Sequence, residues 1–220
     1  MLPPRRPRGS VDSTGRAITF ERSAKNYLAR TERGGMRILS DDDVASLLDL
    51  PALLPEIERA FRKQGRGEVE RPERPHFSVG TGLDDDDPLG TGLTMPAYIH
   101  GDEHYVTKLA SVHQGNAERA LPTVQAQIAV TDARTGEPAG MLAGTRITNA
   151  RTGCIGGLAA NHLAAGDGPV RLGVVGAGTQ ARWQARAIEA ARGIERALIY
   201  SPSDSREACA ADLRAEGIDA

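Results

Sequence analysis

The chain has 220 residues, of which 40% are hydrophobic and 25% are charged, and its formal net charge is −2. This composition indicates a globular protein with a hydrophobic core. The sequence contains no apolar run of about 18 residues, so we expect neither a membrane-spanning helix nor a membrane partner. Basic residues concentrate in residues 1–35 and acidic residues in the remainder. A basic patch on the folded part is therefore missing, which argues against a nucleic-acid-binding domain.

The two cysteines, Cys154 and Cys209, are too few for a disulfide framework or a zinc module. We therefore expect no metal site. Because the basic N-terminus also lacks the apolar stretch of a secretory signal, the sequence favours a cytoplasmic location.

Residues 1–35 are rich in Pro, Gly, Ser and Arg and show no sustained apolar period, which predicts disorder. Patterned sequence begins at Met36. The preceding segment is either a spurious extension before a true start at Met36 or a basic targeting or binding tail.

From Met36 onward the pattern predicts two helices and then a series of strands. Ser40 is a good N-cap for the first helix because three aspartates follow it, and the second helix is predicted from Pro51 to Lys63. We interpret Asp84–Asp87 as a solvated turn and not as a metal site. Residues of strand type, separated by turn residues, fill 76–80, 92–99, 104–113, 124–132 and 138–144.

A helical period returns from Thr145 to Ala165, where Ile147, Ile155 and Leu158 predict the apolar stripe. Glycines at 153, 156 and 157 weaken a helix by roughly 1 kcal/mol each relative to alanine, so they need a packing reason. A linker at 166–168 follows, and then strand, turn, helix, strand and helix.

The sequence LGVVGAGTQA carries the pattern Gly176-x-Gly178-x-x-Ala181 between an apolar strand and an amphipathic helix. Gly176 permits a tight turn, Gly178 lets the backbone approach a pyrophosphate, and Ala181 allows close packing of helix and strand. The N-terminus of the helix then faces the anion. The alternative is a glycine-rich turn in some other α/β unit, but both flanks favour dinucleotide binding.

The second strand of this unit ends at Ser201, where NAD-binding proteins usually place an acidic residue for the ribose hydroxyl. Ser203 and Arg206 lie close by in the sequence. Small hydroxyls and an arginine suit a 2′-phosphate, so NADP is slightly favoured over NAD.

Three cations stand where apolar residues are expected. Strand alternation puts Lys108 on the face of Val106 and Ala110, and Arg151 falls in register with the predicted stripe of its helix. Arg74 precedes the first strand of the series. The alternatives are an edge lysine that reaches water, an interdomain ion pair and an ordinary surface arginine. Together, the three favour binding of an anionic substrate such as a carboxylate.

The chain resembles the ornithine cyclodeaminase/mu-crystallin family from Met36 to its end. The resemblance rests on MRILSDDDVASLLDL, RPERPHF, TMPAYI, YVTKLASVHQGN, LPTVQAQIAVTDARTGEPAGMLAGTRIT, ARTGCIGGLAANHLA and LGVVGAGTQA. It implies an α/β protein in which a Rossmann-type dinucleotide-binding domain, here truncated at 169–220, follows a β-rich α+β substrate and dimerisation domain at 36–165.

The resemblance also implies roles for individual residues. Arg74, Lys108 and Arg151 would hold the substrate carboxylate or the reacting centre, with Lys108 the candidate catalytic residue and Arg151 also reaching the cofactor. Thr123 would lie near the nicotinamide. The pyrophosphate would be held by Gly176, Gly178, Thr179, Gln180 and Ala181.

The family's chemistry implies NAD(P)-dependent hydride transfer at the Cα–N centre of a small amino or imino acid, as in a cyclodeaminase, an amino-acid dehydrogenase or a ketimine reductase, in a homodimer. The alternative is a non-catalytic protein that binds NADPH and a small ligand, as mu-crystallin does. The family's acidic catalytic residue follows a later Rossmann strand, so we expect this chain to be C-terminally incomplete and inactive by itself.

Overall fold

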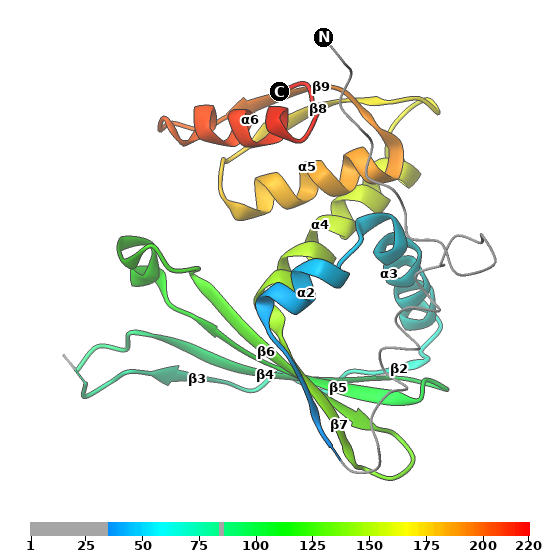
Figure 1. The fold of residues 1–220 in the computed structure, drawn as a ribbon, viewed down its shortest axis with the longest axis vertical. Helices are drawn as coiled ribbons and strands as arrows, with labels where there is room; N and C mark the ends of the chain where they lie inside the picture. Colours follow the sequence, from blue (N-terminus) through cyan, green and yellow to red (C-terminus); the bar gives the residue numbers. More distant parts are fainter. Residues whose placement is uncertain (1–34, 84–85) are drawn as a thin grey trace, which may run out of the picture. The chain divides into compact units, whose positions relative to one another are not determined.

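A mixed seven-stranded sheet forms the first part of the chain (Figure 1), for which a computed structural model describes residues 35–83 and 86–220. The strand order is β1-β7-β6-β5-β4-β2, with β3 also paired to β4; β1 and β7 are parallel and the other pairs antiparallel. The strands are β1 (Arg37–Leu39), β2 (Val69–Glu70), β3 (His76–Val79), β4 (Gly90–Ile99), β5 (His104–Val112), β6 (Val124–Asp132) and β7 (Pro138–Ala143).

The predictions for residues 1–34 and for Asp84 and Asp85 lie outside the described residues. The five predicted strands are all present, each within a few residues of its expected bounds. The turn between β6 and β7 is held by Asp132, whose carboxylate accepts hydrogen bonds from the backbone N–H groups of Arg134 (2.9 Å) and Thr135 (2.8 Å). These bonds lower the pKa of Asp132.

Two helices precede the long strands, as the sequence predicts. Helix α2 (Asp41–Leu47) begins with a capping box, in which Ser40 and Asp43 satisfy each other's backbone N–H groups. Helix α3 (Leu50–Gly65) has Asp49 as its N-cap and a proline at its start. Its buried Leu54 packs with Cys154 and Ala187 in a small core cluster.

Helix α4 (Gly144–Leu163) begins beside β6, where the Thr145 hydroxyl accepts a hydrogen bond from the backbone N–H of Ala126 at 3.0 Å. The stripe predicted for this helix is right only in part: Leu158 packs against the cluster of Leu54, Cys154 and Ala187, but the fully buried face is centred one position earlier. Its buried residues are Gly144, Ala150, Gly153, Cys154 and Gly157, whereas Ile155 is exposed. The helix buries its small residues because another helix backbone lies against them.

That partner is helix α5 (Thr179–Arg192), and it explains the three glycines of α4 (Figure 1). A Cβ at Gly157 would lie 2.6 Å from the carbonyl oxygen of Ala187, and one at Gly153 would overlap the carbonyl oxygen of Trp183. A Cβ at Gly156 would meet only the side-chain end of Gln184. The helices therefore cross at a distance that only glycine permits at 153 and 157.

Helix α5 connects the two strands of a second sheet, β8 (Val170–Val175) and β9 (Ile194–Tyr200), which are parallel. Helix α6 (Ser205–Ala215) follows β9. One core cluster joins these four elements and is centred on the buried residues Ala185, Ala197, Cys209, Leu213 and Ile218. This β-α-β-α order confirms the α/β fold class and the Rossmann-type unit.

The linker between α4 and β8 is held by one side chain. The guanidinium of Arg192 donates hydrogen bonds to the carbonyl oxygens of Ala160 (2.9 Å), Ala164 (3.0 Å), Gly168 (2.9 Å), and also Ala165 and Gly166. Arg192 thus ties the last turn of α4 to the linker that follows it, whose carbonyl groups it binds. None of the helices in the described ranges is both long enough and apolar enough to cross a membrane.

Candidate functional site

The glycine turn, which we define as residues 176–181, connects β8 to α5. Gly176 has φ +103°, a conformation that side-chain-bearing residues rarely adopt. Its N–H donates a 2.8 Å hydrogen bond to the carbonyl oxygen of Tyr200, so the turn lies beside the end of β9. Gly178 is the N-cap of α5, and open space surrounds the position where its Cβ would be. The sequence prediction of a tight turn at Gly176 is confirmed.

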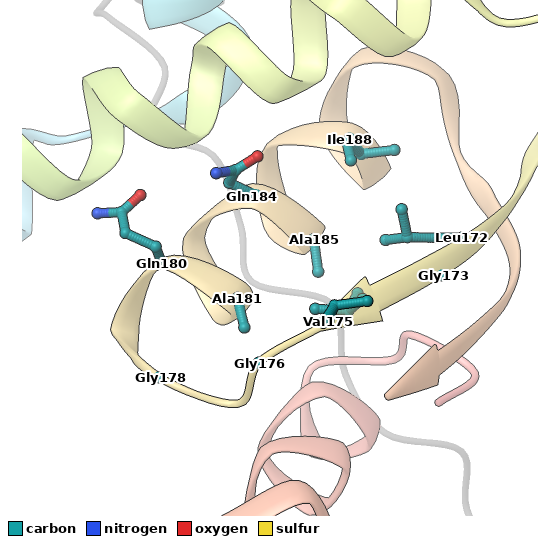
Figure 2. Close-up of a pocket in the computed structure, with 11 residues that line it drawn as sticks. Leu172, Gly173, Val175, Gly176, Gly178, Gln180, Ala181, Gln184, Ala185 and Ile188 are labelled. Carbon is teal, nitrogen blue, oxygen red and sulfur yellow. The ribbon is translucent and has the colours of Figure 1, made fainter. Parts of the chain in front are cut away.

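The N-terminus of α5 has no side-chain cap and no acidic residue in its first turn. Helix α2, by contrast, has both. The first N–H groups of α5 and its dipole are therefore available to an anion. Figure 2 shows the pocket of about 340 Å³ beside the turn; its lining includes Gly176, Gly178, Gln180, Ala181 and Gln184, and its remaining walls are residues 172–175, Ala185 and Ile188.

Gln180 connects the glycine turn to α4. Its side chain points toward α4 in Figure 2, and its Nε2 donates a 2.9 Å hydrogen bond to Oδ1 of Asn149. Its Oε1 is buried and has no hydrogen-bond partner. An unpaired buried carbonyl is unfavourable, and because it can only accept hydrogen bonds it does not contribute to binding an anion at the turn.

Three serines form a hydroxyl cluster at the end of β9. The Oγ atoms of Ser201 and Ser203 lie 3.3 Å apart, those of Ser201 and Ser205 3.1 Å, and those of Ser203 and Ser205 2.7 Å. Ser201 is buried, at 8% exposure. Arg206 donates hydrogen bonds to the carbonyl oxygens of Ser201 (3.3 Å) and Ser203 (3.2 Å), so its guanidinium lies at the same cluster.

The cation cluster, defined as Arg74, Lys108 and Arg151, is assembled from three separate segments. Lys108 pairs across the sheet with Met95 on one side and Ile128 on the other. The N–H of Thr94 donates to the carbonyl oxygen of Pro75, so the antiparallel pairing of β3 and β4 continues one residue beyond His76. The next residue, Arg74, therefore lies opposite Met95. Arg151 comes from α4, which begins against Ile128.

The electrostatics show that the three cations are close to one another. The pKa of Lys108 is lowered, first by burial and then by the positive charges of Arg151 and Arg74. The pKa of Arg151 is lowered by burial and by Arg74. No carboxylate contributes to either shift. The partly buried Lys108 and Arg151 therefore repel each other, and an anionic ligand would relieve that repulsion.

Thr123 lies apart from this cluster in the ladder. It directly precedes β6, and its carbonyl oxygen accepts a 2.9 Å hydrogen bond from the N–H of His113. Lys108 pairs with β6 at Ile128, four residues beyond the first residue of the strand. In the described part of the chain, no hydrogen bond joins Thr123 to the glycine turn or to the cation cluster.

Across the described ranges, no group of three or more His, Cys, Asp or Glu side chains could hold a metal ion. Both cysteines are buried and free. Three of the histidines have acidic neighbours: His100 lies 2.8 Å from Glu70, His162 lies 3.3 Å from Glu58, and His104 pairs across the sheet with Asp132.

Sequence reasoning missed three residues of the region. Ser205 completes the hydroxyl cluster, Asn149 binds Gln180, and Arg182 contacts the glycine turn from behind. A serine or arginine in the first turn of a helix looks like a solvated residue in the sequence. Only the position of Arg182 near a helix N-terminus, where a cation is unfavourable, could have drawn attention to it.

Comparison with known proteins gives a consistent result. The model of the ornithine cyclodeaminase/mu-crystallin family matches residues 36–220. The chain is 31% identical to an alanine dehydrogenase of Archaeoglobus fulgidus over 173 residues, which are 79% of this chain and 49% of that protein. It is 35% identical to Delta(1)-pyrroline-2-carboxylate reductase 1 of Burkholderia multivorans over 67% of this chain and 44% of that one.

Among solved structures, the chain is similar to Delta(1)-pyrroline-2-carboxylate reductase of Thermococcus litoralis in complex with NADH and L-proline. The TM-score is 0.75 and the identity 33%, over 84% of this chain and 55% of that chain. An archaeal alanine dehydrogenase dimer with bound NAD has a TM-score of 0.73 at 27% identity, over 84% and 54%. The chain spans about half the length of the curated relatives it matches. On the match over residues 36–220 and the shared fold, the chain belongs to the ornithine cyclodeaminase/mu-crystallin family.

Proposed function

We propose that this chain carries the nicotinamide-binding turn and the carboxylate-binding residues of an NAD(P)-dependent enzyme that acts at the Cα–N centre of a small amino or imino acid. The observation that carries the proposal is the cation cluster, in which Lys108 and Arg151 are partly buried and repel each other. A substrate carboxylate is the ligand that three converging cations favour, because guanidinium groups bind carboxylates with two parallel hydrogen bonds.

The residues present fit a dinucleotide. Gly178 leaves open the space that a Cβ would occupy, and α5 has an N-terminus with neither a side-chain cap nor an acidic residue in its first turn. When bound, the nicotinamide accepts or returns a hydride at the substrate Cα–N centre. The chain's part is to hold the pyrophosphate through the backbone of Gly176, Gly178, Thr179 and Ala181, with Gln180 beside it.

The cation cluster would orient the substrate for that transfer. Arg74 and Arg151 would bind its carboxylate, with Arg151 also reaching toward the cofactor, since α4 packs against α5. Lys108, whose pKa is lowered, would be able to exchange a proton with the reacting nitrogen or oxygen nearer to neutral pH than an ordinary lysine. Thr123 would contact the nicotinamide. The substrate domain would be residues 36–165, and the dinucleotide-binding unit would begin at residue 169.

We favour NADPH over NADH as the cofactor. The hydroxyl cluster of Ser201, Ser203 and Ser205 offers donors to a 2′-phosphate, and Arg206 adds a positive charge. No acidic side chain ends β9, where one would repel that phosphate. Two exposed carboxylates, Asp204 and Glu207, each lie 3.7 Å from the guanidinium of Arg206.

A homodimer through the seven-stranded sheet accounts for its exposed apolar face. Alternation puts Leu109 on the face opposite Lys108, where Phe77 and Ile38 also lie. Ile38 is 71% and Phe77 57% exposed, which is unfavourable on a monomer surface. A dimer in solution that Leu109→Glu converts to a monomer, by sedimentation equilibrium, would support this interface; an unchanged dimer would move the interface elsewhere.

The second candidate function is non-catalytic binding of NADPH and a small ligand. Turnover separates the two candidates. We would mix the protein with NADPH and Delta(1)-pyrroline-2-carboxylate and follow the loss of NADPH absorbance, and measure L-proline binding by calorimetry in parallel. Turnover supports the enzyme. Because this chain spans about half the length of its relatives and is expected to be inactive by itself, the same assay is run on a version that includes the family's later acidic residue, and binding without turnover in that version supports the binder.

The variant Arg151→Met tests the carboxylate site itself. Loss of a charged hydrogen-bonding partner should weaken L-proline binding by about tenfold or more. Arg146→Met is the matched control, because Arg146 lies on the same helix but is ion-paired to Asp41 at 2.7 Å. Equal L-proline affinity in the parent and in Arg151→Met would remove the cation cluster from the site.

A further inference from the structure

The side chain of Arg182 binds two backbone carbonyl groups of the glycine turn. Its Nη1 donates hydrogen bonds to the carbonyl oxygen of Ala177 at 2.7 Å and to that of Gly178 at 3.4 Å. Its Nε donates to Oδ2 of Asp212, on α6, at 2.6 Å. The side chain is 21% exposed, so the guanidinium is largely enclosed by these partners.

These contacts fix the direction of the neighbouring N–H groups. In a trans peptide the C=O and the following N–H point in opposite directions, and the described chain has no cis peptide bond. A carbonyl of Ala177 that points to Arg182 therefore turns the N–H of Gly178 away from it. The carbonyl of Gly178 does the same for the N–H of Thr179. These two N–H groups are among those left unpaired at the start of α5.

A cation at this position has a cost for the helix itself. Arg182 lies in the first turn of α5, where the helix dipole disfavours positive charge. Its ion pair with Asp212 and its two carbonyl contacts offset that cost. Helix stability alone therefore does not account for an arginine here, whereas holding the turn in the conformation that receives an anion does.

We propose that Arg182 is a positioning residue for the dinucleotide pyrophosphate. It acts through the backbone of Ala177 and Gly178 and makes no direct contact with the phosphates. This inference rests on the proposed nucleotide-binding function of the glycine turn. Arg182 also connects the turn to α6, the helix that carries Ser205 and Arg206 near its start.

The chain provides a matched control four residues further along α5. Arg186 forms a bidentate ion pair with Glu216 at 2.6 and 2.5 Å, just beyond the end of α6, four residues after Asp212. Its side chain is 27% exposed, close to the value for Arg182. Both arginines thus join α5 to the α6 segment in the same way, but only Arg182 contacts the glycine turn.

The test is the affinity for NADPH and NADH, measured by calorimetry, in Arg182→Met, Arg182→Lys and Arg186→Met. Arg182→Met should weaken both cofactors by about tenfold, as expected for the loss of charged hydrogen bonds. Arg186→Met should stay within about twofold of the parent, because the turn is untouched. Arg182→Lys, which keeps the charge but cannot hold both carbonyls and Asp212, should lie between the parent and Arg182→Met.

The ratio of NADPH to NADH affinity distinguishes positioning of the turn from displacement of α6. Ser205 and Arg206 are on α6, so a displaced helix would change the ratio, whereas a disordered turn lowers both affinities by the same factor. The inference would be overturned by any of three results. The first is a changed ratio of NADPH to NADH affinity in Arg182→Met, and the second is a cofactor affinity of Arg182→Met within twofold of the parent. The third is an equal loss of cofactor affinity in Arg186→Met. A parent protein that binds neither cofactor would instead overturn the proposed function.

Discussion

The glycine turn and the cation cluster would bind their proposed ligands by opposite means. The turn would use the backbone N–H groups left unpaired at the start of α5, and the space beside it is open because side chains are absent at Gly176 and Gly178. The cation cluster uses three charged side chains from a loop, a strand and a helix that are far apart in the sequence. The turn is therefore fixed by local backbone conformation, whereas the cluster is fixed only when the sheet and α4 have assembled.

This difference sets where each region is vulnerable. An added side chain should damage the turn without affecting the rest of the molecule. The cluster should be most sensitive to changes in the contacts that hold α4. Each of the following predictions changes one side of this comparison and leaves the other side intact.

Gly178→Val should have the largest effect. Its φ of −83° is acceptable for any residue, and nothing lies within 4 Å of the Cβ position, so the fold should keep its stability. The valine side chain would instead fill the space in which the pyrophosphate meets the backbone. Calorimetry should show NADPH binding weakened by about a hundredfold or more. Unchanged affinity would reject the turn as the nucleotide site.

Adjacent glycines of α4 test the crossing that joins the two regions. A Cβ at Gly157 meets the backbone carbonyl of Ala187 at 2.6 Å, which cannot move without displacing α5. Gly157→Ala should therefore lower the unfolding free energy by about 2 kcal/mol, and the melting temperature by several degrees.

Gly156→Ala is the control for that variant. Its Cβ meets only Oε1 of Gln184, the far end of a flexible side chain, at 2.5 Å. Alanine also favours the helix by roughly 1 kcal/mol over glycine, so this variant should be neutral or stabilised. Equal melting temperatures for the two variants would mean that α4 and α5 are not closely packed in solution.

The same pair of helices shows why the sequence predicted the turn well and the helix face poorly. All determinants of the turn lie within residues 172–181 and act through backbone conformation, so the order of residues is sufficient to identify it. The buried face of α4 is made of glycine, alanine and cysteine, whose side chains are too small to form a stripe of large apolar residues. The large Ile155 appeared to mark the core, but the close approach of α5 selects small residues instead.

The position of Lys108 could be predicted because a strand alternates strictly between two faces. Its closeness to Arg74 and Arg151 could not be derived from periodicity, since it depends on how β3, β5 and α4 assemble. Ser205 and Arg182 were missed for a different reason. Their partners, Ser201 and the carbonyl groups of Ala177 and Gly178, lie only four or five residues away, but the contacts depend on the exact course of the backbone where a helix begins.

Arg206→Gln should have a smaller and selective effect, because Arg206 lies at the hydroxyl cluster and not in the glycine turn. Removing the guanidinium beside the hydroxyl cluster should weaken NADPH binding by about tenfold and leave NADH binding unchanged. Arg214→Gln, on the same helix, serves as the control. If the parent and Arg206→Gln have the same ratio of NADPH to NADH affinity, the hydroxyl cluster and Arg206 do not bind a 2′-phosphate.

Lys108→Met should have the smallest effect on the free protein. The methionine keeps most of the stem and removes a charge that is desolvated and repelled by Arg151 and Arg74. The variant should therefore fold and melt at least as high as the parent, and it should keep cofactor binding because the glycine turn is built separately. An exposed lysine with no role would leave both stability and ligand binding unchanged.

The pH dependence of stability tests the cause of this effect. Because the folded-state pKa of Lys108 lies below its ordinary value of 10.5, the unfolded chain holds this proton up to higher pH than the folded protein. Stability of the parent therefore rises as the pH increases from the folded-state pKa toward 10.5, once the folded protein has lost the unfavourable charge. Below that folded-state pKa the destabilisation is fully present.

The melting-temperature advantage of Lys108→Met should thus be greatest near about pH 7 and shrink toward about pH 10. Lys63→Met is the control, because Lys63 donates to the carbonyl oxygen of His100 at 2.7 Å and lies 3.6 Å from Asp102. That variant should lose stability at both pH values. A Lys108→Met advantage that does not change with pH would show that packing, and not the charge of the cation cluster, sets the stability at this position. It would also remove the electrostatic reason for expecting a carboxylate there.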